Sequence, residues 1–95
     1  MVMIEYRPRE GDRAELLAAL RAARFSRRRT GASRWRVWQD ASAPTRIIEQ
    51  FVVASWQQHL RQGERVTARD QHRLDAIRAL TEPDHPARVT HWLTP

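Results

Sequence analysis

The sequence contains no cysteine, and its apolar runs are short. Without cysteine the chain has no disulfide framework, no thiolate metal site and no cysteine nucleophile. Its apolar runs, such as FVVA at 51–54, are far shorter than the roughly 20 residues that a membrane-spanning helix needs. The first residues, MVMIEYRP, lack the basic segment and apolar core of a signal peptide. We therefore expect a cytoplasmic protein in which residues 1–95 form a single domain.

Lysine is also absent, so all 17 basic residues are arginines, and the net charge is +6. A strongly basic chain suggests a nucleic-acid partner, but these arginines are spread over every segment. Their one run, RRR at 27–29, has no interleaved aromatic residue of the kind that single-strand binding favours. Arginine in place of lysine is instead typical of GC-rich codon usage. We therefore predict no nucleic-acid partner.

The spacing of apolar residues predicts four strands and three helices. The expected strands lie at 1–7, 33–40, 46–53 and 87–93. The helices begin at three sites with capping-box spacing: Asp12 with Glu15, Ser55 with Gln58, and Thr67 with Asp70. The first helix covers 12–29 and stops at Gly31, the second ends at Gly63, and the third ends before Pro83. The RRR run falls in the last turn of the first helix, where the helix dipole favours positive charge.

The order β-α-β-β-α-α-β predicts an α+β, ferredoxin-like fold with a four-stranded antiparallel sheet. Helices are then expected to cover one face of this sheet. The strand at 46–53 is apolar on both faces, with Ile47 and Phe51 on one side and Ile48 and Val52 on the other. The face without helices therefore needs a cover as well. A second copy of the sheet would supply it, so we predict a homodimer that forms a dimeric α/β barrel.

Several motifs carry a family resemblance. They are EYR at 5–7, R-x-R-x-G-A-x-x-W at 27–35, E-x-F-x-x-x-S-W-x-x-H-L-R-Q-x-x-R-V-T at 49–67 and V-x-H at 89–91. Together they resemble the antibiotic-biosynthesis-monooxygenase-like domains. More narrowly, they are similar to the version at the C-terminus of major-facilitator exporters of the transmembrane secretion effector type.

The resemblance implies a dimeric α/β barrel with a cavity between sheet and helices. Some members of the wider family oxidise aromatic polyketides without metal or flavin, and others degrade heme. Gly63 stands where the narrower family usually has a histidine, and the Asn–Trp–His trio of the heme-degrading members is absent. We therefore expect no cofactor. No metal is expected either, because the four histidines are scattered without ligand spacing.

Two residues are candidates for acid–base chemistry. His59 is either a proton acceptor in the cavity or a hydrogen-bond partner near a helix end. Glu49 lies between apolar residues of a central strand, where an unpaired carboxylate is costly. It is either a general base with a raised pKa or the partner of an arginine such as Arg34 or Arg36, or of one from a second subunit.

The aromatic residues are candidates for ligand binding. Those expected to contact a small aromatic ligand are Trp35, Trp38, Phe51, Trp56 and His91. Packing in the core or in a dimer interface is the alternative for each tryptophan, and a hydrogen-bonded core position is the alternative for His91. Convergence of His59 with His91 would favour a site over simple packing.

Two functions remain after these observations. The first is a small-molecule-binding domain, associated with an exporter and without chemistry of its own, that meets the membrane only through that exporter. The second is a cofactor-independent monooxygenase acting on an aromatic or polyketide-like substrate. Such an enzyme would need a base and a partner for a developing oxyanion, which His59, Glu49 and an arginine would provide.

Overall fold

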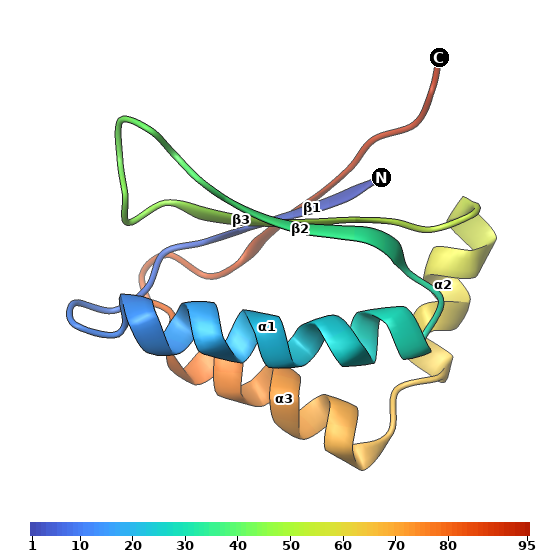
Figure 1. The fold of residues 1–95 in the computed structure, drawn as a ribbon. Helices are drawn as coiled ribbons and strands as arrows, with labels where there is room; N and C mark the ends of the chain where they lie inside the picture. The colour runs from blue at the N-terminus through green and yellow to red at the C-terminus, as the bar shows by residue number, and fades with distance from the viewer.

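The computed structural model describes all 95 residues of the chain. Its elements are β1 (Val2–Tyr6), α1 (Arg13–Arg29), β2 (Ser33–Gln39), β3 (Ile47–Val52), α2 (Trp56–Glu64), α3 (Ala68–Ala79) and β4 (Arg88–His91). This order confirms the predicted α+β, ferredoxin-like fold. Figure 1 shows α1 and α3 side by side below the sheet, with α2 at one end of it. None of the helices is both long enough and apolar enough to cross a membrane.

The four strands form one antiparallel sheet in the order β2-β3-β1-β4. In its register Val2 lies between Phe51 and His91, and Ile4 lies between Glu49 and Val89. Residues directly opposite one another in an antiparallel pair point to the same face. Phe51, Val2 and His91 therefore form one row on the helix side of the sheet. Glu49, Ile4 and Val89 form the adjacent row on the same side.

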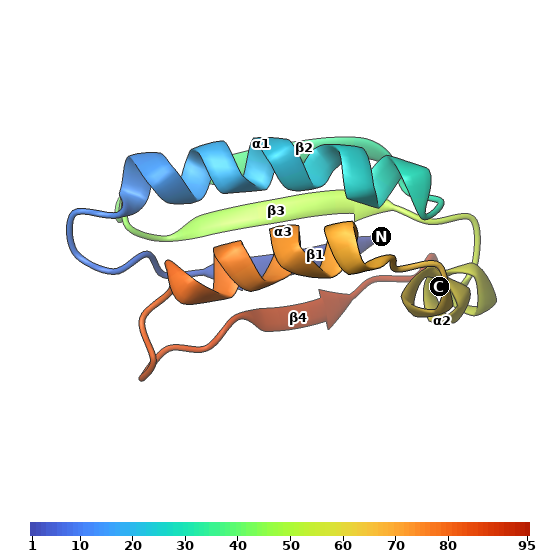
Figure 2. The same ribbon diagram turned by 90° about the horizontal axis from the view of Figure 1, so that it is seen from below.

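The core lies between the sheet and the two long helices. Its buried apolar residues are Val2, Ile4, Tyr6, Leu16, Leu20, Ala23, Ala32, Ile47, Phe51 and Ile77. The period of two predicted in β1 is confirmed, because Val2, Ile4 and Tyr6 are buried while the residues between them are half-buried. Seen from below in Figure 2, α1 lies over the β2 edge of the sheet, α3 lies over β1, and β4 lies to one side of α3.

The opposite face of the sheet carries no helix, as Figure 1 shows. On it Ile48, Gln50 and Val52 of β3 are half-buried. Trp38 is 51% exposed and Trp92 is 55% exposed. We call this surface the open face. Large apolar side chains at such exposure are typical of an interaction surface.

One predicted capping interaction and one predicted helix end are wrong, although Asp12 is the N-cap residue of α1 as predicted. Asp12 makes no side-chain cap on α1, because its backbone (φ −100°, ψ 6°) lacks the extended conformation that side-chain capping requires. Gly63 does not end α2, which continues through Glu64 to a C-cap at Arg65. Glycine is tolerated inside a helix at a cost of about 1 kcal/mol, so it need not mark the end.

The other two capping sites are present. The box of Thr67 and Asp70 forms in full, with Asp70 N donating to Thr67 Oγ1 and Thr67 N donating to Asp70 Oδ2 at 2.9 Å. At α2, Ser55 Oγ accepts a hydrogen bond from Gln58 N at 3.1 Å. The Gln58 side chain accepts instead from Arg65 Nη2 at 3.3 Å, so it does not complete the box.

Candidate functional site

Glu49 is at the centre of a buried polar network on the helix side of the sheet. Its Oε1 accepts hydrogen bonds from Tyr6 Oη at 2.8 Å and Arg27 Nη2 at 3.0 Å. Its Oε2 accepts from Arg27 Nε at 3.0 Å and Trp35 Nε1 at 2.9 Å. A carboxylate has about four lone-pair sites, and four donors occupy them here. Glu49 therefore has no free position from which to take a proton.

The arginine that pairs with Glu49 is Arg27 of α1, not Arg34 or Arg36 of β2. Arg36 is aligned with Gln50, so it points to the open face. Arg34 lies in the irregular stretch of β2 and has a positive φ of 50°. An ion pair, one of the two alternatives for Glu49, is thus present, but the proposed partners are wrong.

The network also fixes the protonation of its other members. Burial and the negative charge of Glu49 raise the pKa of Tyr6 far above its ordinary value. Burial alone would lower the pKa of Arg27, but the hydrogen bonds and charge of Glu49 outweigh it and raise that pKa. Tyr6 and Arg27 are therefore donors at neutral pH, and neither is a base.

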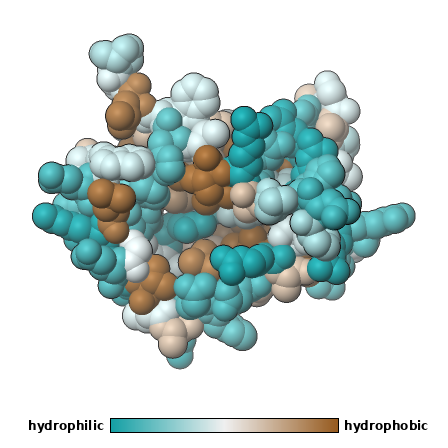
Figure 3. Space-filling model, turned by 180° about the vertical axis from the view of Figure 1, so that it is seen from behind, coloured by the Kyte–Doolittle hydropathy of each residue, from teal (hydrophilic) through white to brown (hydrophobic).

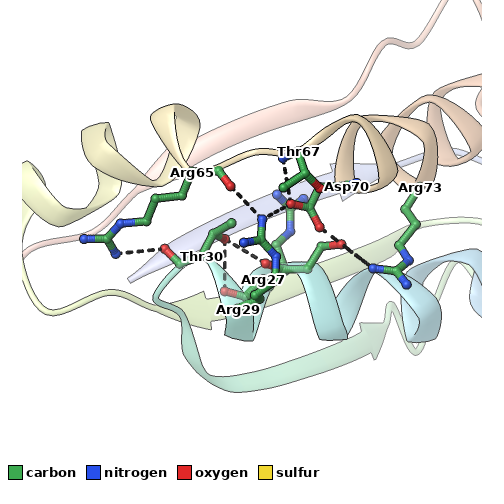
Figure 4. Close-up of polar contacts among 8 residues, drawn as sticks. Arg27, Arg29, Thr30, Arg65, Thr67, Asp70 and Arg73 are labelled. Atoms are coloured by element: carbon green, nitrogen blue, oxygen red, sulfur yellow. Dashed lines mark hydrogen bonds and ion pairs between the residues drawn. The ribbon is translucent and has the colours of Figure 1, made fainter.

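The rest of the R-x-R motif ties the helices together, as Figure 4 shows. Arg29 pairs with Asp70 and donates to the Arg65 carbonyl at 2.6 Å. In return Arg65 Nη1 donates to the Thr30 carbonyl at 3.4 Å. Hydrogen bonds from Arg29 and from the Thr67 backbone hold the pKa of Asp70 well below its usual range. The run at 27–29 is thus not only a response to the helix dipole, because two of its three side chains form specific ion pairs.

His59 of α2 and His91 of β4 converge, although 32 positions separate them. Their Nε2 atoms are 2.9 Å apart, and Trp56 meets the His91 ring edge-on with centroids 4.8 Å apart. One imidazole must donate and the other must accept in this contact, so at least one ring is neutral. Partial burial, His91 and Arg27 lower the pKa of His59. His59 Nδ1 lies 3.2 Å from Gln62 Oε1.

The helix side of the molecule is hollowed by two adjoining cavities, which we call the α3 cavity and the α2 cavity. The α3 cavity, of about 610 Å³, lies between α3, β1 and β4, and Ile4, Ile77 and Val89 form much of its wall. The α2 cavity, of about 440 Å³, is lined by His59 and Gln62 among others. Arg27 and Leu74 line both. Together they form the helix-side cleft, and Figure 3 shows a hollow with apolar residues inside it on the face behind Figure 1.

The predicted site residues do not share one cavity. Trp56 and His91 line a small cavity of about 240 Å³ that also reaches His59. Trp35 and Trp38 of β2 line a cavity of about 390 Å³ at the edge of the sheet, together with residues of α1. Phe51 is buried under the Arg27 guanidinium, 4.9 Å from its ring centroid.

Sequence reasoning missed most residues of the helix-side cleft, among them Tyr6, Arg27, Gln62 and Leu74. Tyr6 and Arg27 entered only as members of the EYR and R-x-R motifs, with Arg27 also in the helix-dipole argument, and Leu74 was not singled out. Gln62 belongs to the H-L-R-Q motif, but an isolated glutamine on a helix carries no signal of its own. No group of three or more histidine or acidic side chains is arranged to hold a metal ion.

Solved structures share this fold at low sequence identity. An antibiotic biosynthesis monooxygenase aligns with 99% of this chain and 97% of its own, at a TM-score of 0.77 and 11% identity. A variant of SnoaB, a cofactor-independent oxygenase from Streptomyces nogalater, aligns with 98% of this chain and 89% of its own, at a TM-score of 0.77 and 16% identity. A protein from Shewanella oneidensis aligns with 94% of this chain and 84% of its own, at a TM-score of 0.73 and 19% identity. These likenesses define the fold as that of the antibiotic biosynthesis monooxygenases.

The family follows from the sequence itself. The family model described as "Transmembrane secretion effector" matches residues 1–95. The chain therefore belongs to the transmembrane secretion effector family. No curated protein matches it.

Proposed function

We propose that this chain binds a small, mainly apolar molecule in the helix-side cleft and carries out no chemistry of its own. The observation that carries this proposal is the α3 cavity, a space of about 610 Å³ whose wall includes Ile4, Ile77 and Val89. Ligand sites are typically concave, mostly apolar and roughly 300–1,000 Å³ in volume. The polar groups at the base of this cavity, Tyr6 and Arg27, hold positions fixed by Glu49.

The state of the polar groups favours binding over catalysis. Glu49 accepts four hydrogen bonds and is completely buried, so it lacks the free lone pair of a general base. Tyr6 holds its proton because its pKa is raised. Because neither Glu49 nor Tyr6 can act as a base, this network favours a cleft that binds a ligand and leaves it chemically unchanged.

The family description supports a setting for this binding. We propose that the chain acts beside an exporter, because it belongs to a family described as transmembrane secretion effectors and has no membrane-spanning helix of its own. In that arrangement its +6 charge would also favour anionic lipid surfaces. Binding to vesicles that is equal for anionic and neutral lipids would remove the lipid part of this proposal.

The binding proposal is tested by filling the cavity. Val89 lines the α3 cavity and is 48% exposed, so Val89→Trp adds bulk there with little disturbance of the core. The matched control is Ala79→Trp, at an exposed position of α3 outside the cavity. Anthrone is titrated into ¹⁵N-labelled protein and followed by NMR shifts. We expect shifts around the helix-side cleft in wild type and control, with binding at least tenfold weaker in Val89→Trp. Equal binding by both variants would reject the proposal.

The alternative function is a cofactor-independent monooxygenase, and the His59–His91 contact is the observation that favours it. A neutral His59 would remove a proton from an acidic CH₂ group. Dioxygen would then take up the electrons, leaving one oxygen atom in a new carbonyl and the other in water. Oxygen consumption with anthrone that is lost in His59→Ala would establish this reaction. Anthrone binding without oxygen uptake would establish the binding domain.

We also propose that a second copy of the chain covers the open face. This surface presents Trp38 and Trp92 at about half exposure beside the half-buried Ile48 and Val52. Two such sheets packed face to face would remove the exposed apolar area from water.

A further inference from the structure

Gln62 of α2 holds a buried hydrogen-bond donor without a partner. The residue is 6% exposed, and its Nε2 is the one buried side-chain nitrogen or oxygen in the chain that makes no hydrogen bond. Gln62 lines the α2 cavity. A donor buried without an acceptor costs free energy, so native structures rarely keep one. A molecule entering the cavity would supply the missing acceptor.

The contact with Gln62 sets the direction of the hydrogen bonds through the histidine pair. Gln62 Oε1 only accepts, so His59 Nδ1, 3.2 Å away, is the donor of that bond. His59 Nε2 then accepts from His91 Nε2 at 2.9 Å. The hydrogen bonds therefore run from His91 to His59 to Gln62, and the free amide NH₂ stands at the end of the chain. Burial lowers the pKa of His59, which agrees with the neutral ring that this order requires.

The rest of the cavity wall selects against a charged ligand group. The Arg27 guanidinium is neutralised by Glu49, and the Asp70 carboxylate is neutralised by Arg29. The apolar residues of the wall are Leu60, Val66 and Leu74. The free amide of Gln62 thus lies in a cavity whose charged groups are already paired. A neutral acceptor on an apolar body fits this wall better than a carboxylate or phosphate.

We propose that Gln62 Nε2 donates a hydrogen bond to a neutral carbonyl oxygen of the ligand. Gln62 is then a specificity-determining residue. It makes the helix-side cleft prefer apolar molecules that carry a neutral carbonyl oxygen over the same body without the oxygen. This inference rests on the proposed function, because it assumes that the cleft receives a small molecule.

The test uses two probes that differ by one acceptor: 9-fluorenone has a carbonyl where fluorene has a CH₂ group. Each is titrated into ¹⁵N-labelled protein in dilute dimethyl sulfoxide, and the side-chain NH₂ signals are followed by NMR. The Gln62 pair is identified by its absence from Gln62→Leu. We expect wild type to bind 9-fluorenone about tenfold more tightly than fluorene, as one hydrogen bond to a buried donor implies. The Gln62 signals should shift with 9-fluorenone and stay in place with fluorene.

Substitutions at position 62 test whether the preference for 9-fluorenone depends on the Gln62 NH₂ group. Gln62→Leu and Gln62→Glu both remove the NH₂ group, and the second keeps the shape of the side chain if the first does not fold. Both should bind the two probes equally. The control Gln57→Leu lies on the same helix at an exposed position and should keep the tenfold preference.

The outcomes separate this inference from the proposed function. Equal wild-type affinities, or a preference that survives in Gln62→Glu, would overturn the role of Gln62. If wild type binds both probes and Val89→Trp binds neither, the cleft remains a binding site and only the inference about Gln62 is overturned. If neither probe binds, the inference is overturned and the proposed function loses its support as well.

Discussion

Replacement of Arg27 by methionine tests the buried network directly. The substitution keeps an apolar stem over Phe51 but removes two of the four hydrogen bonds to Glu49 and its only charged partner. Glu49 is 0% exposed, so its charge stays buried without a counter-charge. Removing one partner of a buried ion pair costs about 3–5 kcal/mol. For a chain of this length, with a stability of roughly 5–14 kcal/mol, the loss is a large share of the total.

The assay is chemical unfolding followed by tryptophan fluorescence at one fixed protein concentration, with a thermal scan beside it. At about 4–8 °C per kcal/mol, Arg27→Met should lower the Tm by at least about 12 °C. The exposed neighbour is the control: Arg28→Met should change the stability by less than about 0.5 kcal/mol.

The effect of a second substitution, Glu49→Gln, on stability should change sign with the residue at position 27. Glu49→Gln alone should destabilise the protein, because it leaves the buried Arg27 charge without its partner. In the Arg27→Met background the same change should stabilise it, because it removes the orphaned carboxylate charge. The reasoning is refuted if Arg27→Met costs less than about 1 kcal/mol, the ordinary effect of a point mutation, or if Glu49→Gln weakens the Arg27→Met variant further.

Three further predictions concern pH and assembly. The lowered pKa of Asp70 means that its stabilisation is present above about pH 4, the ordinary value, and is lost as pH falls further. The unfolding free energies of wild type and Asp70→Asn should therefore converge below pH 4, and a constant gap down to pH 3 would contradict this. The lowered pKa of His59 means that its ring takes up protons less readily in the folded state, so stability should fall as pH decreases below about 6.5; a His59 NMR titration with a midpoint at or above that value would be the opposite result. Ile48→Glu on the open face should convert a dimer into protomers in sedimentation velocity, while Gln57→Glu on α2 should not. A wild-type chain that sediments as a folded single protomer would remove the dimer.

The order and bounds of the elements could be predicted because they depend on local pattern. The period of two around Val2, Ile4 and Tyr6 located β1, and the capping box of Thr67 with Asp70 located the start of α3. The same local signals failed where the backbone differed from the expected conformation. Asp12 has the capping residue type without the capping geometry.

The site could be predicted only in part, because its contacts depend on how the helices pack. That Glu49 needs an arginine follows from its position in a central strand. The choice of Arg27 depends on where the end of α1 lies over β3. The meeting of His59 with His91 depends likewise on the direction of α2. The unpartnered Nε2 of Gln62 is visible only when the surroundings of every polar atom are known.

The position of Arg27 constrains how related chains diverge. This one side chain neutralises Glu49 and also forms part of the wall between the α3 and α2 cavities. Altering it to suit a new ligand would cost about 3–5 kcal/mol of stability. New preferences among relatives should therefore arise at wall positions outside the ion pairs, such as Leu60 on α2 or Pro86 in the connection to β4, where evolution can exchange side chains without unfolding the chain.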